Sequence, residues 1–331
     1  MRELTIDKGT KGQRLDKFLM KYMNKAPKSF VYKMLRKKNI KLNSKKAEGN
    51  EMLSDGDKVQ LFLSEDTLEK FMEAKVVEKA EQTFLVAYED ENVLVVSKPV
   101  GLLVHPDKEN RTGTLNDQLL YYLNKKGEYS PSTESVFTPS ICNRLDRNTS
   151  GLVVMGKNLE AVQELNEMFR NREIDKYYLT AVKGVVKEAG SIEGYHTKTN
   201  DNIASFSKRE VPNSTYVSTK YRPIAVKDGY TLLEVKLETG KSHQIRVCLQ
   251  SLGYYVVGDN KYGNIEANRF FRDKFKLRNQ FLHSYKLVFR KNTRNRITRI
   301  TAIAAMMISS LPFNGVSESV SFIILNTVVV R

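Results

Sequence analysis

The chain has 331 residues, with 54 Lys+Arg against 38 Asp+Glu and a formal net charge of +16 at pH 7. Hydrophobic residues make up 40% of the sequence, enough to fill a core, so a globally disordered chain is excluded. No stretch reaches the roughly 18 uncharged apolar residues of a membrane span, and the N-terminal residues lack the apolar segment of a signal peptide. The two cysteines, Cys142 and Cys248, make neither a disulfide framework nor a zinc site, which indicates a reducing compartment, most simply the cytoplasm.

The excess of positive charge is concentrated near the N-terminus. Between Gln13 and Phe62, 13 Lys or Arg stand against 5 Asp or Glu, so this short segment carries half of the net charge. Such a patch favours a polyanionic partner, with nucleic acid ahead of an acidic protein or a membrane surface. A basic solvated surface without a partner is the alternative.

The first elements in chain order are two short helices and a hairpin. Apolar residues at i, i+3, i+4 and i+7 predict a helix over 15–22, with basic side chains on its other face. A second helix is predicted after Pro27, with Ser29 as its N-cap. Short strands are predicted at 40–42 and 59–61, where apolar and polar residues alternate around polar turns.

This segment resembles the S4 RNA-binding fold in the stretches GQRLDKFL, VYKMLRKKNIKLNSKK and LSDGDKVQL. The resemblance implies contact with structured RNA through the basic helix-turn face. The residues expected to contact RNA there are Arg14, Lys17, Lys33, Arg36, Lys37 and Lys38. A basic α/β module with no role in nucleic-acid binding is the alternative.

The remainder of the chain reads as a strand-rich domain after a polar linker. Residues 64–82 are charged and only weakly helical, which is typical of a linker. Strands are predicted at 84–88, 93–97, 178–182, 216–221, 231–237 and 282–289, and a helix at 159–171. Because strands outnumber helices and do not alternate strictly with them, the pattern favours an α+β fold with a mixed sheet. Residues 291–331 have apolar stretches without a clear period and are either a last β/α layer or an atypical tail.

Several familiar catalytic sites are excluded by spacing. Gly240-Lys241-Ser242 resembles the end of a phosphate-binding loop, but the required earlier glycine falls at Val235. The four histidines are scattered, none at metal-ligand spacing, and no GxSxG motif is present. The sequence therefore disfavours a metalloenzyme, a kinase or a serine hydrolase, and predicts neither a cofactor nor a metal.

An aspartate flanked by two arginines stands out in the middle of the chain. Asp146 lies between Arg144 and Arg147, just before an apolar strand. Neighbouring cations keep a carboxylate ionised even where water is excluded, which suits a nucleophile or an anionic base. A cluster of ion pairs on the surface is the alternative if this motif is taken alone.

Together with GKSHQIRV and GDNKYG, the stretch RLDRNTSGL resembles the RluA-type branch of the pseudouridine synthases. The resemblance implies that Asp146 is the catalytic aspartate and that Arg246 pairs with it. It also implies that Tyr178 stacks on the target base and takes part in proton transfer. Arg144 matches an arginine that fills the space left by a flipped base. The segments containing Thr149, His243 and Gln244 are expected to shape loops, and those of Lys98 and His105 to lie near the cleft.

These observations predict an S4-like RNA-binding domain at 12–63, a linker at 64–82, a catalytic domain with a mixed, mainly antiparallel sheet at 83–290, and an atypical tail at 291–331. The expected activity is that of an isomerase (an intramolecular transferase) that converts uridine to pseudouridine in RNA, most simply in large-subunit ribosomal RNA. The protein is expected to be a monomer. The alternatives are the same reaction on transfer RNA, a non-catalytic RNA-binding assembly factor, and a DNA-binding regulator, which lacks a recognition-helix pattern.

Overall fold

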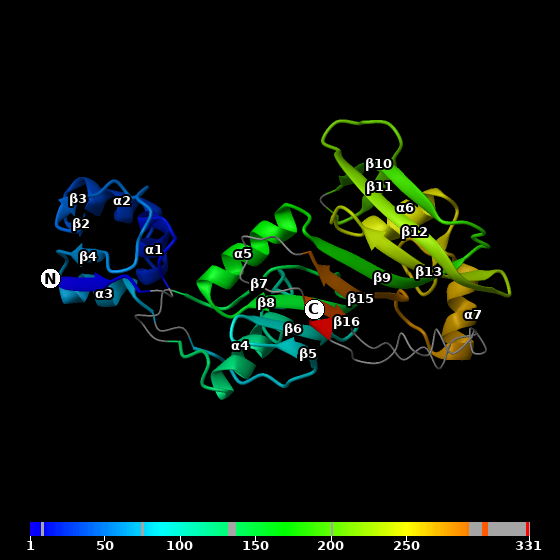
Figure 1. Ribbon diagram of the computed structural model, residues 1–331, viewed down its shortest axis with the longest axis horizontal. Coiled ribbons are helices and arrows are strands. Elements are labelled where there is room, and N and C mark those ends of the chain that lie inside the picture. The colour runs from blue at the N-terminus through cyan, green and yellow to red at the C-terminus, as the bar shows by residue number, and fades with distance from the viewer. Residues whose placement is uncertain are drawn as a thin grey trace. The chain divides into compact units, whose positions relative to one another are not determined.

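The computed structural model describes residues 1–7, 10–73, 76–131, 137–199, 201–290, 300–303 and 329–330 (Figure 1). The chain divides into two compact units. The first consists of Met1–Gln82, Asn116–Ser140 and Gly156–Gln163, and the second of Thr83–Leu115, Ile141–Met155 and Glu164–Arg331. Within the described part, no helix combines the length and the apolar character that a membrane span requires.

A small antiparallel sheet with two helices forms the N-terminal part of the first unit (Figure 1). Its strands lie in the order β1 (Arg2–Thr5), β4 (Lys58–Leu61), β2 (Ile40–Leu42) and β3 (Lys45–Lys46). The predicted helices are α1 (Leu15–Tyr22) and α2 (Lys28–Arg36), and the apolar face predicted for α1 is buried in this core. Strand β1 precedes residue 12, where we expected the domain to begin.

Helix α2 starts two residues earlier than expected. Its N-cap residue is Pro27, with φ −64° and ψ 146°, and the N-cap makes no side-chain hydrogen bond. The prediction that Ser29 caps this helix is wrong, because Ser29 is already inside the first turn. The ring of Pro27 fixes φ near the value needed at a helix start, which fits its place between the turn at 23–26 and the helix.

A third helix lies within the segment that we expected to be a linker. Helix α3 (Glu65–Phe71) follows Ser64, whose side chain accepts a hydrogen bond from the Thr67 N–H at 3.4 Å. Leu68 is fully buried in the N-terminal core, and Phe71 packs against the same cluster. This contact with the N-terminal core makes up for a polar sequence that by itself favours helix only weakly.

The second unit is built on a large mixed sheet (Figure 1). Its strands lie in the order β11 (Ala204–Ser207), β10 (Gly190–Lys198), β12 (Thr215–Lys227), β13 (Tyr230–Leu237), β9 (Ile174–Lys183), β15 (Leu282–Phe289), β8 (Ser150–Gly156), β6 (Val93–Lys98) and β5 (Leu85–Glu89). The pair β8–β15 is parallel, whereas β10–β11, β10–β12, β12–β13, β9–β13, β9–β15 and β5–β6 are antiparallel. The predicted α+β class with a mixed, mainly antiparallel sheet is confirmed.

Most of the helices after residue 83 escaped the sequence prediction. Helix α5 (Leu159–Arg170) is the predicted one, whereas α4 (Leu115–Lys125), α6 (Gln244–Ser251) and α7 (Ile265–Phe275) were not predicted. Helix α6 packs against β10, β11, β12 and the short strand β14 (Tyr255–Val256), and Phe271 of α7 packs with Leu179 and Ala181 of β9. Because α6 begins inside a polar motif and is only eight residues long, its sequence shows no extended helical period.

The predicted tail is described only in part. Strand β16 (Ile300–Ile303) pairs with β15, and β17 (Val329–Val330) pairs with β16. Residues 291–299, 304–328 and 331 lie outside the described residues, and so does most of the prediction made for this segment.

Candidate active site

Asp146 lies in the loop between β7 (Ser140–Ile141) and β8, and its side chain is 27% exposed. The backbone carbonyl of Asp146 accepts a hydrogen bond from Thr149 N–H at 3.0 Å, which closes a tight turn. Thr149 is itself buried, and its hydroxyl accepts a hydrogen bond from the Gln280 amide at 3.3 Å. The expectation that Thr149 shapes the loop agrees with this geometry.

The side chains of Asn143 and Lys98 hold the loop of Asp146 in place. The Asn143 amide accepts a hydrogen bond from Val154 N–H at 2.7 Å and donates one to the Leu152 carbonyl at 3.3 Å, so it binds the backbone of β8. Lys98 is 1% exposed and donates from Nζ to the carbonyls of Pro99, Leu102 and Arg147, at 2.9, 2.8 and 3.0 Å. Burial lowers the pKa of Lys98 to about 8, and the negative charge of Asp146 opposes this shift. Lys98 therefore fastens the loop that starts at residue 98 to the loop of Asp146.

The structure brings Arg246 of α6 to Asp146, although 100 positions separate them in the sequence. Arg246 Nη1 donates to Asp146 Oδ2 at 3.4 Å. The other edge of the guanidinium makes a shorter, bidentate pair with Asp259, from Nε to Oδ2 at 2.6 Å and from Nη2 to Oδ1 at 2.8 Å. Since the Asp259 side chain is fully buried and that of Arg246 is 7% exposed, this pair is a fixed part of the site.

Asp259 is a site residue that the sequence interpretation missed, although it lies within the quoted motif GDNKYG. Its Oδ1 also accepts hydrogen bonds from the backbone N–H groups of Lys261 and Tyr262, at 2.9 and 3.0 Å. The preceding Gly258 has φ +77°, and a Cβ there would lie 2.2 Å from a backbone carbonyl oxygen. The close approach of two backbone segments explains the glycine, and the tight loop that follows turns the Asp259 carboxylate inward.

Tyr178 lies on β9 in register with Val235 of β13 and Ser284 of β15. Its side chain is buried, and burial together with the negative charge of Asp146 raises the pKa of the phenol well above its ordinary value. The hydroxyl therefore stays protonated over the whole neutral range. The charge of Asp146 thus acts on Tyr178, and Arg246 contacts Asp146, whereas the catalytic role of the three residues stays a prediction.

Two aromatic side chains complete the surroundings of Asp146. His243 Nε2 is 3.9 Å from Asp146 Oδ2, and its Nδ1 is 2.9 Å from the Tyr262 hydroxyl. Tyr262 also lies against the Arg246 guanidinium, 4.8 Å from ring centroid to Cζ. Gln244, by contrast, is a buried structural residue: its amide binds Thr239, the Lys241 N–H and β12.

The remaining predicted residues lie on the surface of their units. Arg144 is exposed in the loop of Asp146, two positions before it. In the N-terminal unit Lys17, Lys33, Arg36, Lys37 and Lys38 are exposed, and Arg14 is exposed but paired with the buried Asp16 at 2.9 Å. In the described part of the chain, none of the four cations from Lys33 to Lys38 forms an ion pair. Their charge is therefore available to a partner.

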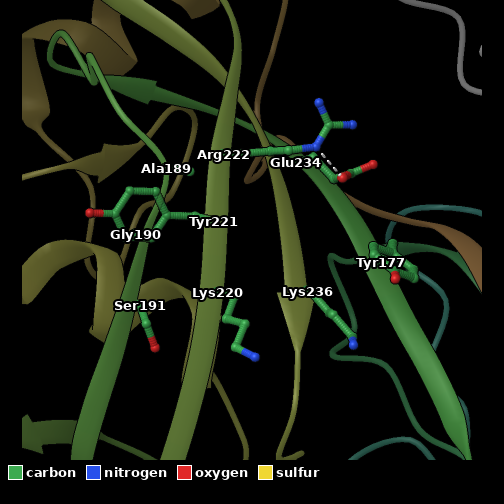
Figure 2. A pocket seen from close by; sticks show the side chains of 9 residues that line it. All are labelled: Tyr177, Ala189, Gly190, Ser191, Lys220, Tyr221, Arg222, Glu234 and Lys236. Carbon is green, nitrogen blue, oxygen red and sulfur yellow. Dashed lines mark hydrogen bonds and ion pairs between the residues drawn. The ribbon is translucent and has the colours of Figure 1, made fainter.

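A cavity of about 460 Å³ lies elsewhere, against strands β9, β10, β12 and β13 (Figure 2). Tyr177 lines it, and because neighbouring side chains of a strand point to opposite faces, the cavity lies on the other face of the sheet from Tyr178. Charged side chains of the lining form ion pairs: Arg222 binds Glu234 at 2.6 Å, and Lys236 binds Asp175 at 3.1 Å. None of the predicted site residues lines this cavity, so the candidate active site is the one around Asp146.

A family model described as RNA pseudouridylate synthase matches residues 92–251. The chain is 32% identical to an RNA pseudouridine synthase of Mycoplasma genitalium, over 92% of this chain and 94% of that protein. It is 29% identical to the ribosomal large subunit pseudouridine synthase C of Vibrio vulnificus, over 86% and 87% of the two chains. It is 28% identical to the ribosomal large subunit pseudouridine synthase D of Nitrosomonas europaea, over 86% and 79%.

A solved structure has a similar fold. The solved structure of human RNA pseudouridylate synthase domain containing 1 has a TM-score of 0.53 at 21% identity, and the match covers 71% of this chain and 86% of that one. At this identity the likeness supports the fold alone. The relative from Mycoplasma genitalium spans nearly the whole of both chains, and the family model covers Asp146, Tyr178 and Arg246. The chain therefore belongs to the RluA-type RNA pseudouridine synthases, which are enzymes that act on RNA.

Proposed function

We propose that Asp146 is the catalytic carboxylate of this pseudouridine synthase and that Arg246 and Tyr178 act beside it. The observation that carries the proposal is the hydrogen bond from a buried guanidinium to one carboxylate at 3.4 Å, beside a buried tyrosine whose pKa is raised by burial and also by that carboxylate. Asp146 remains partly exposed, so a nucleotide can reach it. A carboxylate held in this way suits a nucleophile or a base.

The reaction requires few chemical groups beyond those in this site. Isomerisation of uridine breaks the bond between N1 and C1′ and forms a bond between C5 and C1′. The hydrogen on C5 leaves as a proton and N1 is protonated, so the composition of the nucleotide is unchanged and no oxidant or reductant is consumed. A carboxylate at the ribose either attacks C1′, stabilises positive charge there or removes the 2′ proton, and Asp146 is the carboxylate proposed for each route.

The other residues receive roles that fit their surroundings. Tyr178 is buried and protonated, which suits stacking on the turned base and donation of a proton. Arg144 is exposed on the loop of Asp146, which suits insertion into the space left by an extruded base. Enzymes that act on a base inside folded RNA extrude it, and a side chain in the gap offsets part of the lost stacking.

The N-terminal sheet and its helices form an S4-like RNA-binding module in this proposal. Lys33, Arg36 and Lys37 are spaced i, i+3 and i+4 at the end of α2, so they share one face. These residues are exposed, and the same face continues into Lys38. Phosphate contacts of this kind supply affinity that depends on salt and little on sequence.

Large-subunit ribosomal RNA is the proposed substrate. Two of the similar proteins are ribosomal large subunit pseudouridine synthases, and each matches 86% of this chain. At 28% and 29% identity they support the class of RNA rather than a particular uridine. The shape of an RNA loop that carries a flippable uridine would select the site.

The test is to map pseudouridine in ribosomal and transfer RNA from cells that carry the wild-type gene, no gene, or Asp146→Asn. We expect one or more sites in large-subunit ribosomal RNA to be lost in both mutants. Asp228→Asn is the matched control, because Asp228 is exposed in the turn between β12 and β13, and we expect it to keep all sites.

Each other outcome refutes a defined part of the proposal. Sites lost from transfer RNA instead would refute the substrate and keep the reaction. Sites kept by Asp146→Asn but lost without the gene would refute the role of Asp146. If no site changes in either mutant, a non-catalytic RNA-binding factor becomes the better description.

A further inference from the structure

His243 occupies a defined position between Tyr262 and Asp146. Its Nδ1 is 2.9 Å from the Tyr262 hydroxyl, and its Nε2 is 3.9 Å from Asp146 Oδ2. The two rings meet edge to face, with centroids 5.5 Å apart and an interplanar angle of 61°. The His243 side chain is 16% exposed, so the orientation of the imidazole is set by the protein.

The hydrogen bonds of Tyr262 bear on which nitrogen of His243 carries the proton. The Tyr262 oxygen accepts a hydrogen bond from the Ala204 N–H at 2.8 Å. The hydroxyl has one proton to donate, and His243 Nδ1 at 2.9 Å is the partner to which we assign it. A neutral imidazole that accepts at Nδ1 carries its own proton on Nε2, the nitrogen that faces Asp146.

The charges around His243 favour this neutral ring. Burial lowers its pKa, Asp146 raises it, and Arg246 of α6, Lys261 of the loop before α7 and Lys198 of β10 lower it further. The net effect is a pKa below the ordinary value of histidine. The ring is therefore uncharged at neutral pH, with a single N–H that points toward the Asp146 carboxylate.

The backbone at His243 is also unusual. With φ 58° and ψ 13° it is left-handed, a conformation that costs energy for residues other than glycine. His243 stands at the N-cap of α6, but its side chain makes no capping hydrogen bond there. The imidazole instead lies between Tyr262 and Asp146.

We propose that His243 is a positioning residue for Asp146, with its Nε2–H held in place by Tyr262; this inference rests on the proposed role of Asp146. Arg246 Nη1 and His243 Nε2 both face the same oxygen, Oδ2, at 3.4 and 3.9 Å. The two donors hold the carboxylate through Oδ2, so Oδ1 is the oxygen that acts at the ribose. Hydrogen bonds in active sites are often long before the substrate is bound and shorten in the reacting complex.

The first test is Tyr262→Phe in the full chain. The variant removes the donor to His243 Nδ1, so the ring can adopt the other tautomer, which turns a lone pair toward Asp146. We expect kcat to fall about tenfold while KM for RNA changes less than twofold. Activity is measured as tritium released from C5 of uridine-labelled large-subunit ribosomal RNA made in cells without the gene. Tyr216→Phe, which removes a hydroxyl from an exposed tyrosine of β12, is the control and should leave kcat unchanged.

The pH profile separates this role from a merely structural one. At a pH below the pKa of His243 the imidazolium carries a proton on both nitrogens, so Nε2–H is present whatever Tyr262 does. The ratio of wild-type to Tyr262→Phe kcat should therefore shrink toward 1 as the pH is lowered through the pKa of His243, which ring NMR of the wild type locates. A ratio that is the same on both sides of that pKa would overturn the proposal.

A pair of substitutions at His243 tests the reach of the donor. The amide of His243→Gln can place an N–H near the position of Nε2, whereas that of His243→Asn ends near Nδ1. We expect His243→Gln to retain kcat within about threefold of wild type and His243→Asn to lose about tenfold or more. Equal losses in the two variants would overturn the proposal.

The tautomer can be measured without any activity. The chain has only four histidines, so the nitrogen shifts of their rings can be resolved by NMR and His243 identified from its loss in His243→Gln. We expect the Nε2–H form in wild type and a mixture of tautomers in Tyr262→Phe; an Nδ1–H form in wild type would overturn the proposal. If Asp146→Asn kept wild-type activity, the proposed function would fail, whereas the tautomer result would stand on its own.

Discussion

The buried pair between Arg246 and Asp259 gives a prediction that can be worked out from the structure. In Asp259→Asn the carboxylate becomes an amide of the same size, so packing is kept while the negative charge is lost. The amide oxygen retains the place of Oδ1, which accepts from Arg246 Nη2 at 2.8 Å and from the backbone N–H groups of Lys261 and Tyr262. The amide NH₂ then faces Arg246 Nε, which loses its acceptor at 2.6 Å, while the contact with Asp146 at 3.4 Å remains.

The expected cost follows from the burial of both side chains. Removal of one partner of a buried ion pair costs about 3 to 5 kcal/mol. Because Asp146 still compensates part of the Arg246 charge, we expect the lower end of that range, about 3 kcal/mol. For a unit of this size each kcal/mol lowers Tm by roughly 2 to 4 °C, so Tm should fall by roughly 6 to 12 °C.

The pKa of Asp259 determines how the loss of stability in Asp259→Asn changes with pH. Burial alone would raise the pKa of Asp259, but the hydrogen bond and charge of Arg246 outweigh burial, so the pKa is lowered in the folded protein. The stabilisation is therefore complete above the unfolded-state pKa of about 3.9 and is lost as the pH falls through the lower folded-state value. The difference in stability between wild type and Asp259→Asn should be constant from pH 7 to 5 and shrink in stronger acid.

Thermal unfolding followed by circular dichroism at several pH values is the assay. Asp273→Asn is the matched control, because Asp273 is 66% exposed and its ion pair with Arg272 is at the surface, where such pairs contribute little. A change in Tm below 2 °C for Asp259→Asn, or one equal to that of the control, would refute the reasoning.

Three further predictions concern other parts of the molecule. Lys98→Met leaves the carbonyls of Pro99, Leu102 and Arg147 without their donor and should cost about 2 kcal/mol, as measured by urea unfolding. Since burial lowers the pKa of Lys98 to about 8, wild type should also gain stability over this variant as the pH rises above 8. Gly151→Ala places a Cβ 2.1 Å from a carbonyl oxygen of β15 and should cost more than about 4 kcal/mol in the same assay. Gly229 has open space around it, so Gly229→Ala should cost only about 1 to 2 kcal/mol, and similar costs for the two variants would contradict this account. Charge reversal of Lys33 and Arg36 should weaken RNA binding and reduce the slope of log affinity against log salt by about 1.5, and an unchanged slope in filter binding would exclude these contacts.

Much of the N-terminal fold was predictable from local pattern. The apolar spacing of α1 and the alternation in β2 and β4 are properties of a few neighbouring residues, and the structure confirms each of these elements. Elements that form only through contacts with distant parts of the chain were harder to predict from the sequence. Helix α3 needs Leu68 to reach the N-terminal core, and α6 and α7 are short helices held mainly by the sheet beneath them.

The sequence by itself determined the family and which residues are proposed to carry the chemistry, because the motifs around Asp146 and Arg246 are short stretches whose residue types are specific. Only the tertiary structure decided how they meet. The order of β9, β15 and β8 brings Tyr178 and the loop of Asp146 together, and α6 returns Arg246 to that loop from 100 positions away. The contacts of Asp259, Tyr262 and His243 follow from hydrogen-bond geometry between separate segments, which depends on positions in space and leaves no period or spacing in the sequence.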